Sequence, residues 1–246
     1  MEINPQNEID KIIDFIKTTF KSQGYKKAIV AVSGGLDSTV TLSLAVKALG
    51  TDNVYSLQLP YKRQSTYLST LIIDHLEIPQ SQRLILKLSR SVDKLAIKLN
   101  ARKDKLRFGN ILARARMVCL FDQAKAKNAL VIGTENKSEN LLGYYTRYGD
   151  QASDLDPISH LYKTQVIALA KELSLPEKII SAPPSAELWK DQTDEKELGF
   201  SYQQADPILE AVLEKKSTDS FDSSLVDKIL DRLQAVDFKT KVPYHL

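Results

Sequence analysis

Cysteine, glycine and long apolar runs are all scarce in this sequence of 246 residues. Its one cysteine, Cys119, excludes an intrachain disulfide and a cysteine-rich zinc site. Nine glycines exclude a collagen-like chain, and a hydrophobic content of 43% excludes intrinsic disorder. The longest apolar runs, such as residues 28–32, fall far short of the ~20 residues that cross a bilayer. We therefore expect a soluble, reduced, cytoplasmic protein without a membrane partner.

Charge of one sign is not in large excess either. The sequence has 34 Lys and Arg residues against 31 Asp and Glu residues, a formal net charge of +3. A balance this close to neutral does not by itself indicate binding to nucleic acid, and we expect none. The first residues, MEINPQNE, contain neither a basic segment nor an apolar one, so they do not resemble a secretion signal.

Strand-like and helix-like segments alternate along the first half of the sequence. Apolar residues at helical spacing predict helices over residues 8–20, 36–48, 66–76 and 110–127. Short apolar or β-branched runs predict strands over residues 26–32, 53–59, 83–88 and 129–132. This alternation is typical of parallel strands joined by right-handed crossovers. We therefore predict an α/β fold with a doubly wound, mainly parallel sheet flanked by helices. Because no linker is evident, residues 1–246 are expected to form a single domain with a helical C-terminal tail.

A glycine-rich turn follows the first predicted strand. Residues 31–39 read AVSGGLDST, so two glycines connect the strand to a helix that has Asp37 and Ser38 in its first turn. Unpaired amides at a helix N-terminus attract anions, and Gly34 and Gly35 allow the backbone to approach a phosphate closely. The turn has neither the Walker A pattern nor the third glycine of a dinucleotide fingerprint. Since a carboxylate repels phosphate, Asp37 indicates a bridging Mg²⁺. The alternative is a plain turn capped by Asp37 or Ser38.

Closely spaced acids and glycines recur in residues 131–165, which read VIGTENKSENLLGYYTRYGDQASDLDPISHLYKTQ. Thr134 comes directly after a predicted strand, so it should lie at the carboxyl edge of the sheet, where doubly wound folds bind ligands. Glu139 is then placed to meet Asp37 as a second Mg²⁺ ligand, and Lys163 suits a phosphate as a point charge. A solvated polar loop is the alternative, but the interleaved tyrosines are unusual for one.

The SGGLDS turn resembles the pyrophosphate-binding loop of the ATP pyrophosphatase superfamily, whose members cleave ATP to AMP and pyrophosphate. More widely, residues from about 8 to 210 resemble the ammonia-dependent NAD⁺ synthetase family. The other segments that carry this resemblance are GNILARARM, GTENKSE, LGYYTRYGD, PISHLYKTQ, and PPSAELW with the following QTDEKELG. Members of the family adenylate the nicotinate carboxylate of deamido-NAD⁺ with ATP, after which ammonia displaces AMP.

The resemblance implies ATP as co-substrate, Mg²⁺ as cofactor, and deamido-NAD⁺ and ammonia as the other substrates. It assigns ATP binding to Ser33, Gly34, Gly35, Leu36, Asp37, Ser38, Thr134, Lys163 and Ser185. It assigns deamido-NAD⁺ binding to Arg114, Arg147, Asp154, Phe238 and Lys239, and Mg²⁺ binding to Asp37 and Glu139. The catalytic residues that it implies are Asp37, Asp150 and Lys163, with Asp150 placed to help deprotonate ammonium.

The C-terminal segment departs from the family pattern. Many relatives end with a His-Lys-Arg segment that closes over the substrate, whereas Phe238 takes the place of the histidine here and Lys239 still supplies a cation. Ser185 stands where many relatives have threonine and retains the hydroxyl. Residues 60–108 match the family only loosely, which leaves the adenine contacts open.

Two further properties follow from the resemblance and the composition. The helix that contains GNILARARM lies at a dimer interface in the family, so we expect a homodimer. We also expect free ammonia, not glutamine, as the nitrogen donor, because the sequence leaves no room for an amidase domain. Cys119 moreover follows the apolar spacing of its predicted helix, where desolvation disfavours a thiolate.

Three other functions are alternatives to this one. A tRNA-modifying ATP pyrophosphatase commonly needs paired cysteines or an RNA-binding domain, and this sequence has one cysteine. A nucleotide sensor without catalysis is opposed by the joint presence of Asp37, Glu139, Asp150 and Lys163. Amidation of nicotinate mononucleotide in place of deamido-NAD⁺ stays open.

Overall fold

The computed structural model describes residues 3–189 and 191–244. Within them, four parallel strands form one sheet in the order β3-β2-β1-β4. The strands are β1 (Lys27–Ala31), β2 (Val54–Gln58), β3 (Arg83–Ile85) and β4 (Ala129–Val131). The central residue Ile29 pairs with Tyr55 of β2 on one side and with Val131 of β4 on the other. The predicted α/β fold with a parallel sheet is confirmed.

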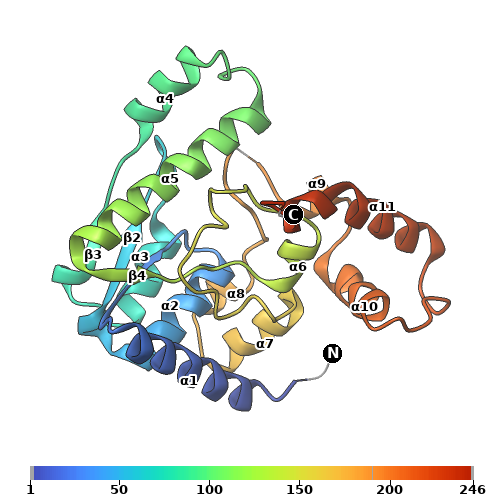
Figure 1. Cartoon of the computed structure of the whole chain (residues 1–246), viewed down its shortest axis with the longest axis horizontal. Helices are drawn as coiled ribbons and strands as arrows, with labels where there is room; N and C mark the ends of the chain where they lie inside the picture. The colour runs from blue at the N-terminus through green and yellow to red at the C-terminus, as the bar shows by residue number, and fades with distance from the viewer. Residues whose placement is uncertain (1–2, 190, 245–246) are drawn as a thin grey trace.

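Helices cover both faces of the sheet (Figure 1). One face packs against α1 (Pro5–Gln23), α2 (Leu36–Leu49) and α7 (Lys163–Glu172), and the other packs against α4 (Ser89–Lys98) and α5 (Lys105–Lys127). Both faces need a cover because the apolar side chains of a strand such as β1 alternate between the two faces of the sheet. Ala28 and Val30 belong to the first core, and Ile29 belongs to the second. All three side chains are fully buried.

The predicted helices and strands before residue 132 are present, with ends that differ by a few residues. Helix α3 (Tyr67–His75) follows β2, and short 3₁₀ turns at Thr51–Asn53 and Gln80–Gln82 precede β2 and β3. Helix α5 begins earlier than predicted because Asp104 caps it, accepting a hydrogen bond from the Arg107 amide at 3.0 Å. Helix α4 is present although the sequence pattern did not predict it.

Helix α8 (Glu177–Ile180) packs against the first core through Ile179, and the helices after it share a third core with the segment that follows β4. The helices of the third core are α9 (Asp194–Leu198), α10 (Tyr202–Leu213) and α11 (Ser223–Thr240). Tyr202 and Ile229 of this region pack with Leu142 and Tyr162, which flank α6 (Lys137–Leu141) and α7. In Figure 1, α10 and α11 accordingly lie beside α6 and α7, on the side of the molecule away from β3. In the part of the chain that the structure describes, none of these helices combines the length and apolarity needed to cross a membrane.

Candidate active site

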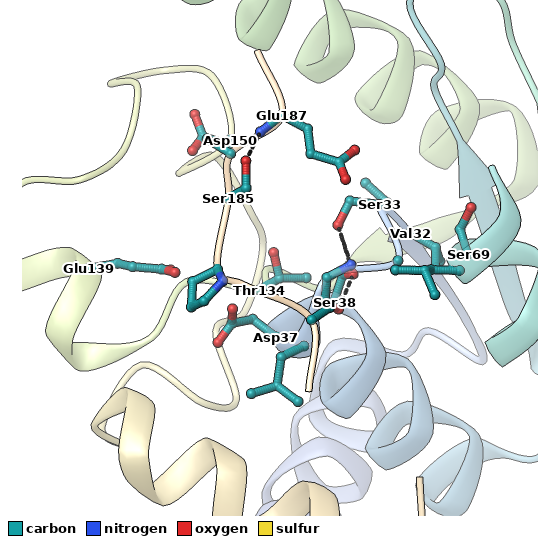
Figure 2. A pocket seen from close by; sticks show the side chains of 18 of the residues that line it. Val32, Ser33, Asp37, Ser38, Ser69, Thr134, Glu139, Asp150, Ser185 and Glu187 are labelled. Carbon is teal, nitrogen blue, oxygen red and sulfur yellow. Dashed lines mark hydrogen bonds between the residues drawn. The ribbon is translucent and has the colours of Figure 1, made fainter. Parts of the chain in front are cut away.

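The turn after β1 has a conformation that glycine makes possible. Gly34 has a φ of +95°, and a Cβ atom on it would lie 2.6 Å from the backbone nitrogen of Ser69. The Ser33 hydroxyl accepts a hydrogen bond from the Gly35 amide at 3.1 Å and lies 3.0 Å from the Ser38 hydroxyl. Ser38 in turn donates to the Gly35 carbonyl at 3.0 Å (Figure 2). These hydrogen bonds make the turn rigid. No side chain caps the start of α2, so the first amides of this helix remain available to an anion.

The segment after β4 reaches the same edge of the sheet, because β1 and β4 are neighbours. The Gly133 amide donates to the Leu155 carbonyl at 2.8 Å, and a Cβ atom on Gly133 would lie 1.7 Å from Asp156 Oδ1. Glycine is therefore required for the close approach of these two segments. Thr134 follows it directly and faces the turn after β1 (Figure 2).

A cavity of about 430 Å³ lies between these two segments. Its walls include every residue that was predicted to bind ATP: Ser33, Gly34, Gly35, Leu36, Asp37, Ser38, Thr134, Lys163 and Ser185. The other predicted metal ligand, Glu139, and the predicted catalytic Asp150 also line it. Figure 2 shows Glu139 pointing toward Asp37 and Thr134 across this space. The structure thus brings together residues that are far apart in the sequence.

The ammonium group of Lys163 joins the two predicted metal ligands. Its Nζ atom donates to Asp37 Oδ2 and to Glu139 Oε1, the second contact at 3.3 Å, and the side chain is almost fully buried. The Asn136 side chain connects the two residues, since it donates to Asp37 Oδ1 at 2.9 Å and accepts from the backbone amide of Glu139 at 3.0 Å. Asn136 and Glu139 form a capping box at the start of α6. This N-x-x-E pattern is visible in the sequence and was not used there.

The electrostatics of this cluster favour a bound cation. Burial lowers the pKa of Lys163, but the adjacent carboxylates of Asp37 and Glu139 outweigh it and hold that pKa above its ordinary value. Burial, together with the charge of Asp37, raises the pKa of Glu139 well above its ordinary value. Lys163 therefore carries its charge at neutral pH, and a further cation beside Glu139 would favour the ionised form of that carboxylate.

Two cavity residues were not singled out as ligands from the sequence. Arg116 on α5 donates to the Leu59 carbonyl at 3.2 Å and to Gln64 Oε1 at 2.8 Å. Asp194 accepts a hydrogen bond from the Tyr202 hydroxyl at 3.0 Å, and its other oxygen has no partner among the described residues. Both residues lie in segments that carry the family resemblance, Arg116 in GNILARARM and Asp194 in QTDEKELG, so a usable signal was present for each.

Ser185 holds its own loop together at the cavity wall. Its hydroxyl donates to the Gln192 carbonyl at 2.7 Å and accepts from the Glu187 amide at 3.1 Å (Figure 2). The Gln64 side chain donates to Glu187 Oε2 at 2.6 Å, which ties this loop to the one after β2.

The five residues predicted to bind the dinucleotide acid do not line the cavity. Arg114 donates to the Arg147 carbonyl at 3.1 Å, and the Arg147 guanidinium lies 5.1 Å from the centre of the Phe238 ring. Lys239 donates to the carbonyls of Gly143 and Tyr145, the second at 2.9 Å. Asp154 accepts a hydrogen bond from the Val131 amide at 2.7 Å. The structure thus separates a cavity group from a second group around Arg147, and it places Asp154 beside β4.

Comparison with known proteins identifies the family. The family model described as NAD synthase matches residues 8–243. The chain belongs to the NAD synthase family. An NH₃-dependent NAD⁺ synthetase of Fusobacterium nucleatum is 36% identical over 252 residues, which cover 99% of this chain and 96% of that protein.

Two solved structures show how far the NAD synthase fold extends over this chain. An NH₃-dependent NAD synthetase from Campylobacter jejuni is 32% identical, superposes with a TM-score of 0.84, and covers 100% of both chains. An NMN synthetase from Francisella tularensis is 28% identical, has a TM-score of 0.87, and covers 100% of this chain and 99% of its own. The NAD synthase architecture therefore extends over the whole chain.

Proposed function

We propose that this protein is an ammonia-dependent NAD⁺ synthetase that amidates deamido-NAD⁺ at the expense of ATP, giving NAD⁺, AMP and pyrophosphate. The observation that carries the proposal is the cavity at the carboxyl edge of the sheet. There the SGGLDS turn, Thr134 and Ser185 surround the ion cluster of Lys163, Asp37 and Glu139. Membership of the family and the likeness to the named synthetases supply the reaction.

Mg²⁺ fits this cluster by the chemistry of its donors. Asp37 and Glu139 present carboxylate oxygens around a position that already attracts the Lys163 ammonium. No three His, Cys, Asp or Glu side chains among residues 3–189 and 191–244 gather closely enough to hold an ion by themselves. Mg²⁺ usually binds through one or two carboxylates with phosphate oxygens and water completing its shell. Asp37 and Glu139 are therefore the residues that would hold it, and the bound ion would neutralise charge on the ATP phosphates.

The chain's own groups account for the adenylation step. The free amides at the start of α2 and the Lys163 ammonium are donors for phosphate oxygens, and both are fixed in place before the substrate arrives. Preorganised donors of this kind stabilise charge that develops in the transition state without further reorganisation. Neither adenylation nor the amidation that follows requires a protein nucleophile. The carboxylate of the acid attacks ATP in the first step, and ammonia attacks the resulting adenylate in the second. Asp150, at the cavity wall, is the candidate for removing a proton from ammonium.

Ammonia is the proposed nitrogen donor. Use of glutamine requires an activated nucleophile, usually a cysteine thiolate. Partial burial and the nearby charge of Asp122 raise the pKa of Cys119, the only thiol in the sequence, so the thiol form is favoured. Cys119 moreover does not line the cavity.

We further propose that the active form is a homodimer. Helix α5 exposes two large apolar side chains on either side of Arg114 along its length, Leu106 with 66% and Val118 with 61% of its surface accessible. The residues predicted to bind the acid lie outside the cavity, where one chain leaves them exposed or partly exposed. A second chain packed on α5 would cover these apolar groups and complete the acid site.

Amidation of nicotinate mononucleotide is the second candidate function. It is favoured by one observation, the TM-score of 0.87 with the NMN synthetase from Francisella tularensis. The cavity group of residues does not distinguish the two acids, because they share the nicotinate carboxylate that reacts.

One assay tests the proposed function against its alternatives. Purified protein would be supplied with Mg²⁺, ATP and either acid, with ammonium or ammonia-free glutamine as the nitrogen donor. We expect formation of NAD⁺ from deamido-NAD⁺ and ammonium at a kcat/KM well above that for nicotinate mononucleotide. A higher kcat/KM for the mononucleotide would establish the second candidate. Equal rates with glutamine would exclude ammonia dependence. Light scattering that shows only the 27.6 kDa single chain as active species would exclude the homodimer.

A further inference from the structure

Asp206 on α10 lies outside the cavity but is bonded to residues beside two of its charged groups. The side chain is fully buried, and Asp206 is not among the cavity-lining residues. Its Oδ1 atom accepts a hydrogen bond from the Ser138 hydroxyl at 2.6 Å. Its Oδ2 atom accepts from the Thr164 amide at 2.9 Å and from the Thr164 hydroxyl at 2.8 Å. Three donors thus converge on one buried carboxylate.

These bonds fasten the two short stretches of backbone that carry Glu139 and Lys163. Ser138 directly precedes Glu139, and its hydroxyl also accepts a hydrogen bond from the Lys163 amide at 2.9 Å. Thr164 directly follows Lys163 in the first turn of α7. Helix α6 has only five residues, too few for its own hydrogen bonds to fix its orientation. Its position relative to α7 therefore depends on such cross-links.

A carboxylate is the group that this geometry requires. The Ser138 hydroxyl has one hydrogen, and since its oxygen accepts from Lys163, that hydrogen is directed to Asp206. Both Asp206 oxygens must consequently accept, which an amide side chain cannot do with its nitrogen. If an asparagine replaced Asp206, its NH₂ group would face a donor, and either Ser138 or Thr164 would keep an unpaired polar group in a buried position.

We infer that Asp206 is a positioning residue that sets the separation of Glu139 and Lys163 and so assembles the Mg²⁺–ATP site from the C-terminal helices. This inference rests on the proposed function for the identity of the ligand. Helix α10 would then help to form the site in addition to packing in the core. Tyr202 of the same helix also donates a hydrogen bond to Asp194 at the cavity wall. Helix α10 thereby becomes part of the nucleotide site.

The test compares Asp206→Asn with Leu209→Ala, a matched control on the same helix whose buried side chain belongs to the apolar core only. Binding of Mn²⁺ in the presence of a non-hydrolysable ATP analogue would be followed by electron paramagnetic resonance, without any acid. We expect the Asn variant to bind Mn²⁺ and the analogue about 10- to 100-fold more weakly, the size of effect that follows a misplaced site. Leu209→Ala should lose at least as much thermal stability and keep its affinity.

Ser138→Ala and Thr164→Val make the test independent of the folding of the Asn variant. Ser138→Ala removes the link to both Asp206 and the Lys163 amide, so it should also weaken Mn²⁺–nucleotide binding. Thr164→Val keeps the backbone amide bond and should have a smaller effect. Unchanged affinity in both Asp206→Asn and Ser138→Ala would overturn the inference, as would an equal loss in Leu209→Ala. Since no acid is present, the outcome is separate from the question of whether the wild-type protein forms NAD⁺.

Discussion

The Lys163 ammonium lies 3.3 Å from the Glu139 carboxylate, although the two residues belong to different helices. The same ammonium is bonded to Asp37, so one buried cation links the starts of α2, α6 and α7. Without this cation, two carboxylates would face each other in a poorly solvated place, which is costly. The lysine therefore stabilises the apo site, and in the proposed reaction its charge would bind a phosphate.

The first prediction concerns Lys163→Met. Removing one partner of a buried ionic cluster should cost about 3–5 kcal/mol of unfolding free energy. Added Mg²⁺ should then raise the melting temperature of the variant more than that of the wild type, because it supplies the missing charge. Lys171→Met, an exposed position on the same helix, is the control and should change neither property. A melting temperature of Lys163→Met that does not respond to Mg²⁺ would contradict the proposed ion site.

The second prediction contrasts the two glycines of the turn. Gly34→Ala places a methyl group 2.6 Å from the Ser69 nitrogen in a left-handed conformation, so it should cost about 2 kcal/mol or more of stability. Gly35→Ala meets only the Ser33 hydroxyl at 3.3 Å and should cost about 1 kcal/mol or less. Urea unfolding of both variants in the absence of ATP measures the difference. Equal losses would show that the turn is not fixed in the way described.

The third prediction concerns the dependence of stability on pH. Burial, with a contribution from Asp150, raises the pKa of Glu135 to about 8 although Asn140 donates to it. Between its unfolded pKa near 4.5 and about 8, the folded protein holds a proton on Glu135 that the unfolded chain has lost. Wild-type stability should accordingly fall as pH rises through this window, by up to ~1.4 kcal/mol per pH unit from this group.

Glu135→Gln removes this titration and keeps an acceptor for Asn140. We expect the variant to be more stable than the wild type at pH 8 and above, with the advantage shrinking toward pH 5. Glu172→Gln, at an exposed position, provides the comparison and should leave the pH profile as it is. Parallel pH profiles for the wild type and Glu135→Gln would refute the assignment.

The fourth prediction separates the two groups of site residues. Lys239 donates to the Gly143 and Tyr145 carbonyls and so holds the loop that carries Arg147. Lys239→Met should raise the KM for the acid about tenfold or more, as expected for a loss of uniform binding, while the affinity for ATP stays within about twofold. Lys241→Met, which removes only an exposed pair with Asp237, is the matched control. An equal loss of ATP affinity would place Lys239 in the nucleotide site.

Much of the candidate nucleotide site was predictable because it depends on local patterns. A short apolar run followed by SGGLDS specifies a strand, a glycine turn and a helix start, and the turn with Thr134 lies at the cavity as predicted. Helix α4 was missed although its pattern is helical, since its buried residues Val92 and Ala96 stand four positions apart.

Contacts between distant residues were not available from spacing. Lys163 and Asp37 are 126 positions apart, and their meeting depends on how α7 packs against α2. The resemblance to a family supplied both residues, but neither it nor the residue pattern indicated that they pair with each other. Asp206 had no sequence signal at all, since an acid in an amphipathic helix is ordinarily a solvent-facing residue. The residues predicted to bind the acid do not line the cavity, and the structure of one chain leaves those around Arg147 exposed or partly exposed.

The most direct measurement follows one oxygen atom through the reaction. Deamido-NAD⁺ labelled with ¹⁸O in its nicotinate carboxylate would be incubated with the protein, Mg²⁺, ATP and ammonium. If the cavity adenylates the acid, AMP and pyrophosphate will form in equal amounts with NAD⁺, and each AMP will carry one ¹⁸O atom. Asp37→Asn should abolish both products together, because metal charge stabilisation is worth several kcal/mol. Release of ADP and labelled inorganic phosphate, or unlabelled AMP formed without NAD⁺, would contradict the account.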